Sequence, residues 1–278
     1  MKSQDAFVRI TVLSENTGCE TCEGEHGLSL YIEHNTDHIL LDAGQSDLFY
    51  ENAGKLGIDI GGVNYAILSH SHYDHSDGFE TFFKVNKDAN LYVRKGTGEY
   101  FYSKHSELKY IGPKKGMLEA NKNRIIYVDE KYYSIGDGDM FLVPHSTRGL
   151  SAIGEKSNLY KMEGERLVPD DFAHEQSFVI NTSKGLVIFN SCSHGGPANV
   201  IHEVLQQENR YPVYAYIGGF HLSKYPDEDV LAFAETLKDL QVERIITGHC
   251  TGDRACHILK EQLGDKVEQM HAGMVIEM

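Results

Sequence analysis

The stretch Ser69-His70-Ser71-His72-Tyr73-Asp74-His75 decides the fold and the chemistry expected of this chain. It places three imidazoles and one carboxylate within six residues, directly after the apolar segment 65–69. Imidazole and carboxylate are the usual ligands of zinc, and of iron or manganese in hydrolytic sites. Side chains alternate along a strand, so His70 and His72 point to the same side, and the turn that follows can bring Asp74 and His75 to a second position. The stretch therefore predicts a site for one or two divalent metal ions, with zinc first and iron or manganese as alternatives.

Hydrophobic periodicity and turn residues divide the rest of the chain into alternating strands and helices. We expect strands at 7–13, 28–33, 38–42, 65–69, 91–94, 125–129, 177–181, 186–190, 213–217 and 242–247. We expect helices at about 46–57, 197–205, 227–240 and 253–263.

The two halves of the chain also resemble each other. In each half a hairpin and a helix precede an apolar strand, and the segment 65–72 is similar to the segment 214–221. This pattern predicts an α/β fold in which two similar halves pack face to face with their helices outside. The segment from about 95 to 170 is weakly periodic and rich in Gly, Lys and Tyr, so we expect a loop-rich insertion within a single domain that spans 1–278.

The composition excludes several classes of protein. Of the 278 residues 41 are acidic and 26 are basic, which gives a formal net charge of −15. Such a chain repels nucleic acid unless it carries a local basic stripe, and its basic runs are short, so we expect no nucleic-acid partner. No apolar run approaches the roughly 18 residues of a membrane helix, and the first residues do not read as a signal peptide. We expect a cytoplasmic protein that acts on a small-molecule substrate and has no membrane partner.

Several segments carry a resemblance to a known family. The pattern His-x-His-x-Asp-His at 70–75 is the signature of the metallo-β-lactamase superfamily. Further segments resemble one branch of it, named for 7,8-dihydropterin-6-methyl-4-(β-D-ribofuranosyl)aminobenzene-5′-phosphate synthase; they are 25–29, 39–44, 191–195, 218–222 and 248–252. The resemblance implies a four-layer αββα sandwich with a metal site where the two sheets meet.

The resemblance also implies a ligand set. His70 and His72 would hold one ion together with a third histidine, and Asp74, His75 and His249 would hold the other. For the third histidine we favour His194, because it follows the strand expected at 186–190. The alternatives are His145, which lies in a Pro-His-Ser-Thr-Arg-Gly segment, and His174, which lies just before a strand.

One departure from the family pattern affects the second ion. Many two-metal members carry a bridging aspartate after the strand that here ends near Asn190, and this sequence offers Ser191 and Cys192 instead. Cys192 can be a thiolate ligand or an ordinary buried cysteine. The occupancy by one ion or by two stays open at this stage.

Some residues are expected to serve the site in roles other than metal binding. His221 mirrors His72 in the second half, and we expect it to donate a proton to a leaving group or to bind a phosphate. Asp74 is expected to accept a proton as well as to bind metal. Asp42 ends a strand at the same edge and can orient a ligand imidazole, and the resemblance places His26 near the site.

These observations predict a metal-dependent hydrolase of an ester, phosphoester or lactone, with a pterin- or phosphate-bearing substrate implied by the resemblance alone. One alternative is a metal-dependent transferase or synthase acting on a pterin precursor. The other is a metal-containing ligand sensor without turnover. The isolated pair Cys19 and Cys22 lacks the further ligands of a zinc site, and we expect it to be part of an incidental loop or of a flap over the substrate.

Overall fold

The computed structural model describes residues 7–278, in which the strands form two seven-stranded sheets and one four-stranded sheet. The first sheet contains β18 (Val275–Glu277), β1 (Val8–Ser14), β2 (Ser29–His34), β3 (Asp37–Leu41), β4 (Tyr65–Ile67), β5 (Asn90–Arg94) and β8 (Ile125–Val128), in this spatial order. The second sheet contains β17 (Val267–Gln269), β16 (Arg244–Thr247), β15 (Val213–Ile217), β14 (Gly185–Phe189), β13 (Gln176–Thr182), β10 (Met140–Pro144) and β9 (Tyr133–Ile135).

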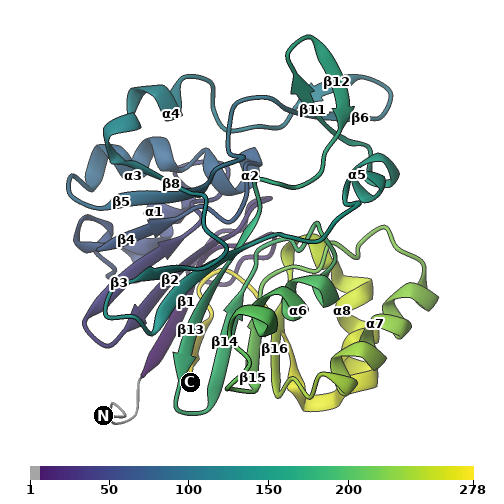
Figure 1. The fold of residues 1–278 in the computed structure, drawn as a ribbon. Coiled ribbons are helices and arrows are strands. Elements are labelled where there is room, and N and C mark those ends of the chain that lie inside the picture. The colour runs from purple at the N-terminus through teal and green to yellow at the C-terminus, as the bar shows by residue number, and fades with distance from the viewer. Residues whose placement is uncertain (1–6) are drawn as a thin grey trace.

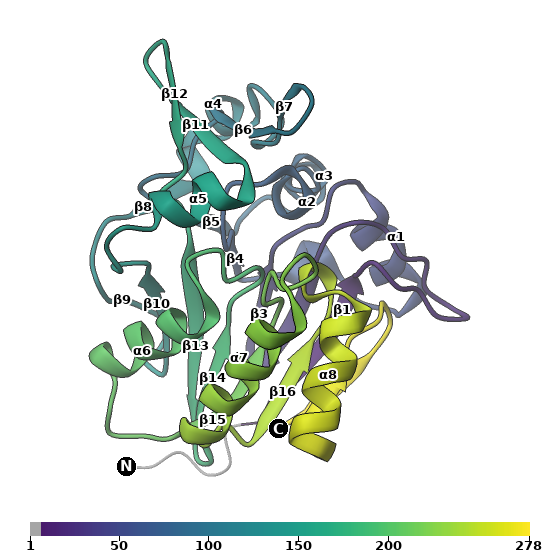
Figure 2. The same ribbon diagram turned by 90° about the vertical axis from the view of Figure 1, so that its right-hand side faces the viewer.

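Helices cover the outer face of each large sheet, so the fold is the predicted four-layer αββα sandwich (Figures 1 and 2). The helices on the first sheet are α1 (Leu48–Lys55), α3 (Phe79–Val85) and α4 (Met117–Ala120). The helices on the second sheet are α6 (Pro197–Gln207), α7 (Asp227–Asp239) and α8 (Asp253–Leu263).

The main core lies between the two large sheets. It contains Ile10 and Ile32 from the first sheet and Phe178, Phe189 and Ile217 from the second, each with at most 1% of its surface exposed. Strands that are covered by a partner sheet on one face and by helices on the other must be apolar on both faces. This is why β14 reads as a continuous apolar run and why β13 has three consecutive apolar residues at its centre.

The direction of the strands brings one set of loops together. In the first sheet β3, β4, β5 and β8 run parallel, and in the second sheet β14, β15, β16 and β17 do so. In open sheets of this kind the loops that follow the carboxyl ends of the strands form the site. The segment 69–75 follows β4, so the fold predicts that the loops after β14, β15 and β16 lie around it.

The segment from about 95 to 170 contains more regular structure than its sequence predicts. A third sheet is built from β6 (Phe101–Lys104), β7 (Leu108–Tyr110), β11 (Leu159–Glu163) and β12 (Arg166–Pro169), and it lies beside α5 (Ser151–Ser157) at one end of the molecule (Figure 1). Most residues of these four strands are at least partly exposed, so they show no period-2 pattern. Strands β8, β9 and β10 of the same segment belong to the large sheets.

Among residues 7–278 no helix combines the length and the apolar composition that crossing a bilayer requires.

Shortening a side chain in the core between the two large sheets is expected to lower the stability of the protein. Ile32→Ala should lower the free energy of unfolding by about 2–5 kcal/mol, because it removes a fully buried side chain and leaves a cavity. The control Leu231→Ala changes a side chain of α7 that is 41% exposed, and it should stay within about 0.5 kcal/mol of the parent. Urea denaturation of both variants provides the measurement. Equal losses in the two variants would contradict the assigned core.

Candidate metal centre

All six predicted ligands lie at one edge of the two large sheets. His70 and His72 follow β4, and Asp74 and His75 lie in the short helix α2 (Tyr73–Ser76). From the second sheet, His194 follows β14 and His249 begins the 3₁₀ turn η3 (His249–Thr251) after β16. The structure therefore brings together residues that are up to 179 positions apart, and their roles as ligands stay predictions.

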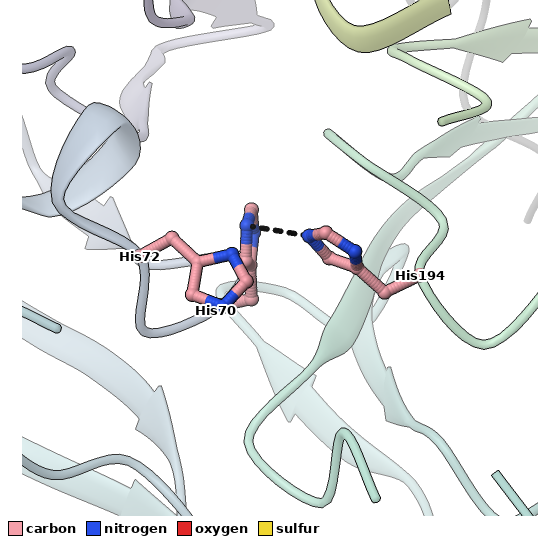
Figure 3. A group of neighbouring side chains, drawn as sticks. All are labelled: His70, His72 and His194. Atoms are coloured by element: carbon pink, nitrogen blue, oxygen red, sulfur yellow. Dashed lines mark hydrogen bonds between the residues drawn. The ribbon is translucent and has the colours of Figure 1, made fainter. Parts of the chain in front are cut away.

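His70, His72 and His194 form the first histidine cluster (Figure 3). One ring nitrogen from each lies within 4.8 Å of the other two, and Nε2 of His70 is 3.3 Å from Nε2 of His194. Burial lowers the pKa of His70 and of His194 well below the usual value, and it lowers the pKa of His72 to about 3. All three imidazoles are therefore neutral near pH 7 and offer lone pairs.

The tautomer of His70 follows from its neighbours. The Ser69 hydroxyl donates a hydrogen bond to Asp42 Oδ2 at 2.6 Å. Because its one proton is used there, Ser69 Oγ accepts a hydrogen bond from Nδ1 of His70 at 2.9 Å. Nε2 of His70 then carries a lone pair and faces His194. Nitrogens that bind one tetrahedral zinc at about 2.0–2.1 Å lie about 3.3 Å apart, which matches the observed separation.

Two ring nitrogens of the first cluster are buried without a hydrogen-bond partner among the described residues. They are Nε2 of His72 and Nδ1 of His194. Orphaned buried nitrogens are costly in a folded protein unless something else satisfies them. A cation in the first cluster would satisfy Nε2 of His72, whereas His194 faces His70 through Nε2 and not through its orphaned Nδ1. Three neutral, converging imidazoles thus fit a divalent cation of the zinc type.

Asp74, His75, His249 and His26 form the second cluster. Nε2 of His75 lies 3.1 Å from Nε2 of His249. Oδ2 of Asp74 lies 3.4 Å from Nε2 of His249 and 3.2 Å from Nε2 of His26. Nδ1 of His75 donates to Asp42 Oδ2 at 2.8 Å, and Nδ1 of His249 faces the Asn16 side-chain oxygen at 2.9 Å. With both Nδ1 atoms acting as donors, two lone pairs face each other across 3.1 Å, and only a proton or a cation between them removes the repulsion.

The charges of the second cluster agree with this geometry. Burial alone would raise the pKa of Asp74, but His75, His249 and His26 lower it well below the usual value. Burial alone would lower the pKa of His249, but the hydrogen bond to Asp74 and the surrounding negative charges raise it to about 9. The cluster thus attracts positive charge, as a cation site requires.

His145 and His174, the alternative third ligands, have both ring nitrogens engaged elsewhere. His145 lies between the carboxylates of Glu175 and Glu203, and its Nδ1 is 2.6 Å from Glu203 Oε2. His174 Nδ1 accepts the backbone N–H of Ser71 at 2.9 Å, while its Nε2 pairs with Asp170 at 3.0 Å. Neither histidine has a nitrogen free for the first cluster, which leaves His194 as the third member.

His221 lies at the rim of the clusters. Its ring centroid is 4.4 Å from that of His194, and its Nδ1 is buried without a hydrogen-bond partner among the described residues. A cavity of about 150 Å³ opens there, lined among others by His26, His72, Asp74, His194, His221 and His249. His221 therefore faces the space in which a reacting group would lie next to both clusters.

The sequence analysis missed the residues that hold two of these histidines in place. Glu15 Oε1 accepts the backbone N–H of His249 at 2.6 Å, and Asn16 binds its ring. Glu175 accepts the backbone N–H groups of His194 and Gly195 at 3.1 and 3.3 Å. These acidic and amide residues precede or follow strands without any local pattern, so no sequence signal distinguished them from ordinary turn residues.

A sequence model of the metallo-β-lactamase superfamily matches residues 23–195, a range that includes the first histidine cluster and ends before His221 and His249. The 7,8-dihydropterin-6-methyl-4-(β-D-ribofuranosyl)-aminobenzene-5′-phosphate synthase of Methanocaldococcus jannaschii is 30% identical to the chain. That alignment of 267 residues covers 91% of this chain and 90% of the synthase.

Two solved structures have similar folds. Tm1679, described as a metal-dependent hydrolase of the β-lactamase superfamily, has a TM-score of 0.84 and 29% identity, with 98% of this chain and 99% of that chain covered. YhfI of Bacillus subtilis, a metallo-β-lactamase fold protein, has a TM-score of 0.58 and 12% identity over 98% of this chain and 100% of its own. The second likeness concerns the fold alone.

The ion triad around His145 should make stability depend on pH. Burial would lower the pKa of His145, but Glu175 and Glu203 raise it to about 10, against about 6.5 in an unfolded chain. Its contribution to stability is therefore fully present below about pH 6.5 and is lost as the pH rises towards 10. Thermal unfolding followed from pH 6.5 to 10 should show a steeper fall for the parent than for His145→Gln. Parallel profiles would mean that His145 is not charged in the folded protein.

Proposed function

We propose that this chain, which belongs to the metallo-β-lactamase superfamily, is a metal-dependent hydrolase of an ester, phosphoester or lactone. The observation that carries the proposal is the pair of facing nitrogens in each cluster, 3.3 Å apart in the first and 3.1 Å apart in the second. Adjoining sites of this kind are typical of two-metal hydrolases. The description of the relative Tm1679 as a metal-dependent hydrolase supports the same reaction class.

His70, His72 and His194 would hold one divalent ion. Asp74, His75 and His249, whose facing atoms lie 3.1–3.7 Å apart, would hold the other. Neutral imidazoles with one carboxylate suit zinc best, with iron or manganese as alternatives. Divalent ions in such a site make water nucleophilic near neutral pH and neutralise negative charge that develops on the substrate.

The chain itself supplies the proton transfers. Asp74 lines the cavity, and its Oδ2 faces Nε2 of His26 and of His249, so this carboxylate can accept a proton from the attacking water. His221 lies next to His194 at the same cavity and its Nδ1 has no hydrogen-bond partner among the described residues, so it can donate a proton to the leaving oxygen. Asp42 fixes His75 directly and fixes His70 through Ser69, so that Nε2 of His70 faces His194 and Nε2 of His75 faces His249.

The surroundings of His221 favour an anionic substrate. A second hollow of about 130 Å³ shares His221 and is lined also by His105, Lys156 and Lys224, with serines and one asparagine but no acidic residue. In a chain with a net charge of −15 such a local absence of acids favours a negatively charged group. We propose that the substrate carries a phosphate.

The second candidate is a metal-dependent synthase or transferase. It is favoured by the relative from M. jannaschii, whose name describes a synthase that makes a compound uniting a dihydropterin with a ribofuranosyl aminobenzene phosphate. The same polarising site serves both reactions, and the acceptor decides between them, since water gives hydrolysis and an amine gives transfer. Incubation of the metal-loaded protein with phosphoesters, lactones and pterin derivatives, with and without an arylamine, separates the two by product analysis. No turnover with any of them would favour a sensor.

The double variant His70→Ala/His72→Ala should lose at least one metal ion per chain and all hydrolytic activity, because two of the three nitrogens of the first cluster are gone. Metal analysis of the purified protein and assay with the best substrate of the screen provide the measurements. His202→Ala is the matched control, since His202 is exposed on α6 and should keep metal and activity. Unchanged metal content in the double variant would refute the assignment.

His221→Ala should keep its metal while kcat falls by about 10²–10⁴-fold, the usual contribution of general acid catalysis. The loss should be smallest for substrates with a leaving group such as p-nitrophenolate, which departs without a proton, and largest for alkyl esters. The control Ser223→Ala removes a hydroxyl from the same hollow and should leave this dependence on the leaving group intact. Loss of metal together with activity would make His221 a ligand instead.

A further inference from the structure

Cys192 lies where the two clusters meet. It follows β14 by three residues, only 2% of its surface is exposed, and its Sγ is 3.3 Å from Nε2 of His75. Sγ also lies within 4.8 Å of a ring nitrogen of His70. Because His70 belongs to the first cluster and His75 to the second, this sulfur is within reach of both metal positions.

No carboxylate of the described residues occupies this junction. Asp74 is on the far side of the second cluster, where its Oδ2 is closer to His26 and His249 than to His75, at 3.2 and 3.4 Å against 3.7 Å. Asp42 stands behind His75, on its Nδ1 side. Two neighbouring dications repel each other, and an anionic ligand shared between them offsets that repulsion. The side chain in place for this task is the thiol of Cys192.

We propose that Cys192 is a thiolate ligand shared by the two metal positions, in the place where a bridging aspartate is expected and absent. The inference rests on the proposed metal-dependent function. On binding, the thiol gives its proton to solvent and sulfur forms the bond to metal, so no oxidant or reductant takes part. A thiolate among imidazoles also narrows the choice of metal, because it favours zinc over manganese or magnesium.

The surrounding structure holds the sulfur in place. The side-chain oxygen of Asn190 accepts the backbone N–H of Ser193 at 2.7 Å, and Ser193 Oγ donates to the carbonyl of Gly219 at 2.7 Å. Both bonds fix the loop on either side of Cys192. Asp42 keeps Nδ1 of His75 protonated, so that Nε2 and the sulfur point at a common position.

A neighbouring cysteine provides the control. Cys250 lies in the same pocket, but its Sγ accepts the backbone N–H of His221 at 3.3 Å, and it groups with Cys192 and His221 rather than with either metal cluster. A cysteine that only happens to be close to the centre should therefore behave like Cys250.

The test uses the full-length protein, stripped of metal and titrated with Co²⁺. Thiolate ligation of Co²⁺ gives a charge-transfer band in the near ultraviolet, which imidazole and carboxylate ligands do not give. We expect this band in the parent and in Cys250→Ser. In Cys192→Ser we expect the band to vanish and the bound cobalt to fall by about one equivalent, with the remaining ion in the first cluster. A parent that binds two cobalt ions without the band, or a Cys192→Ser variant that keeps it, would overturn the proposal.

Two further measurements keep the outcome decisive. Cys192→Asp restores a carboxylate, so it should bind two ions without the band, and circular dichroism checks that both variants fold. If they do not fold, X-ray absorption of zinc-loaded Cys250→Ser should still show sulfur at about 2.3 Å from zinc. A first shell of nitrogen and oxygen alone would refute the thiolate and leave the hydrolase proposal intact, whereas absence of any bound metal would refute both.

Discussion

The buried carboxylate of Asp42 orients one histidine in each of the two clusters. It lies at the end of β3 in a left-handed backbone conformation, with φ of 58°, and it accepts hydrogen bonds from the backbone and hydroxyl of Ser69 and from Nδ1 of His75. Through the Ser69 hydroxyl it also fixes His70. A fully buried carboxylate is expensive unless donors satisfy it, and these three donors come from the stretch that carries the ligands. The same hydrogen bonds therefore offset the free energy of burying the Asp42 charge and fix the orientation of the His70 and His75 rings.

The second sheet also uses a buried carboxylate to hold its histidine loop. Glu175 holds this loop by accepting the backbone N–H groups of His194 and Gly195. The His145 ring lies between the carboxylates of Glu175 and Glu203 and forms an ion pair with each. Asp42 thus positions histidines of the first sheet and Glu175 positions His194 of the second, while Glu15, which follows β1, holds His249 from the other sheet. The dry core between the sheets then fixes one half against the other, since close-packed cores resist small displacements. The separation of the facing nitrogens depends on this packing.

Local patterns in the sequence predict which histidines come together at the site. Spacing within 69–75 predicts a ligand turn after a strand, and the position of His194 after the strand now seen as β14 separates it from His145 and His174. The partners of the ligands follow no such rule. Asn16 meets His249 across 233 positions, a contact created by the pairing of whole sheets. The strands between 101 and 169 were missed for a related reason, because a half-exposed antiparallel sheet imposes no clear hydrophobic period on its residues.

The proposed thiolate also bears on how an acidic protein receives an anionic substrate. The imidazoles of the first cluster are neutral, and the anions nearest the two metal positions are Asp42, Asp74 and, as proposed, Cys192. With both positions filled as proposed, the four positive charges of two dications would exceed the three negative charges of these groups, although the whole chain carries −15. Exposed acids are screened over about 8 Å at physiological salt, while charges in the buried centre act through a medium of low dielectric constant. The hollow beside His221, which has lysines and no acids, extends this favourable field outward. An anion that reaches the cavity would therefore be attracted at short range. A carboxylate in place of the Cys192 thiolate would carry the same charge, so the thiolate affects which metal binds and leaves the net charge of the centre unchanged.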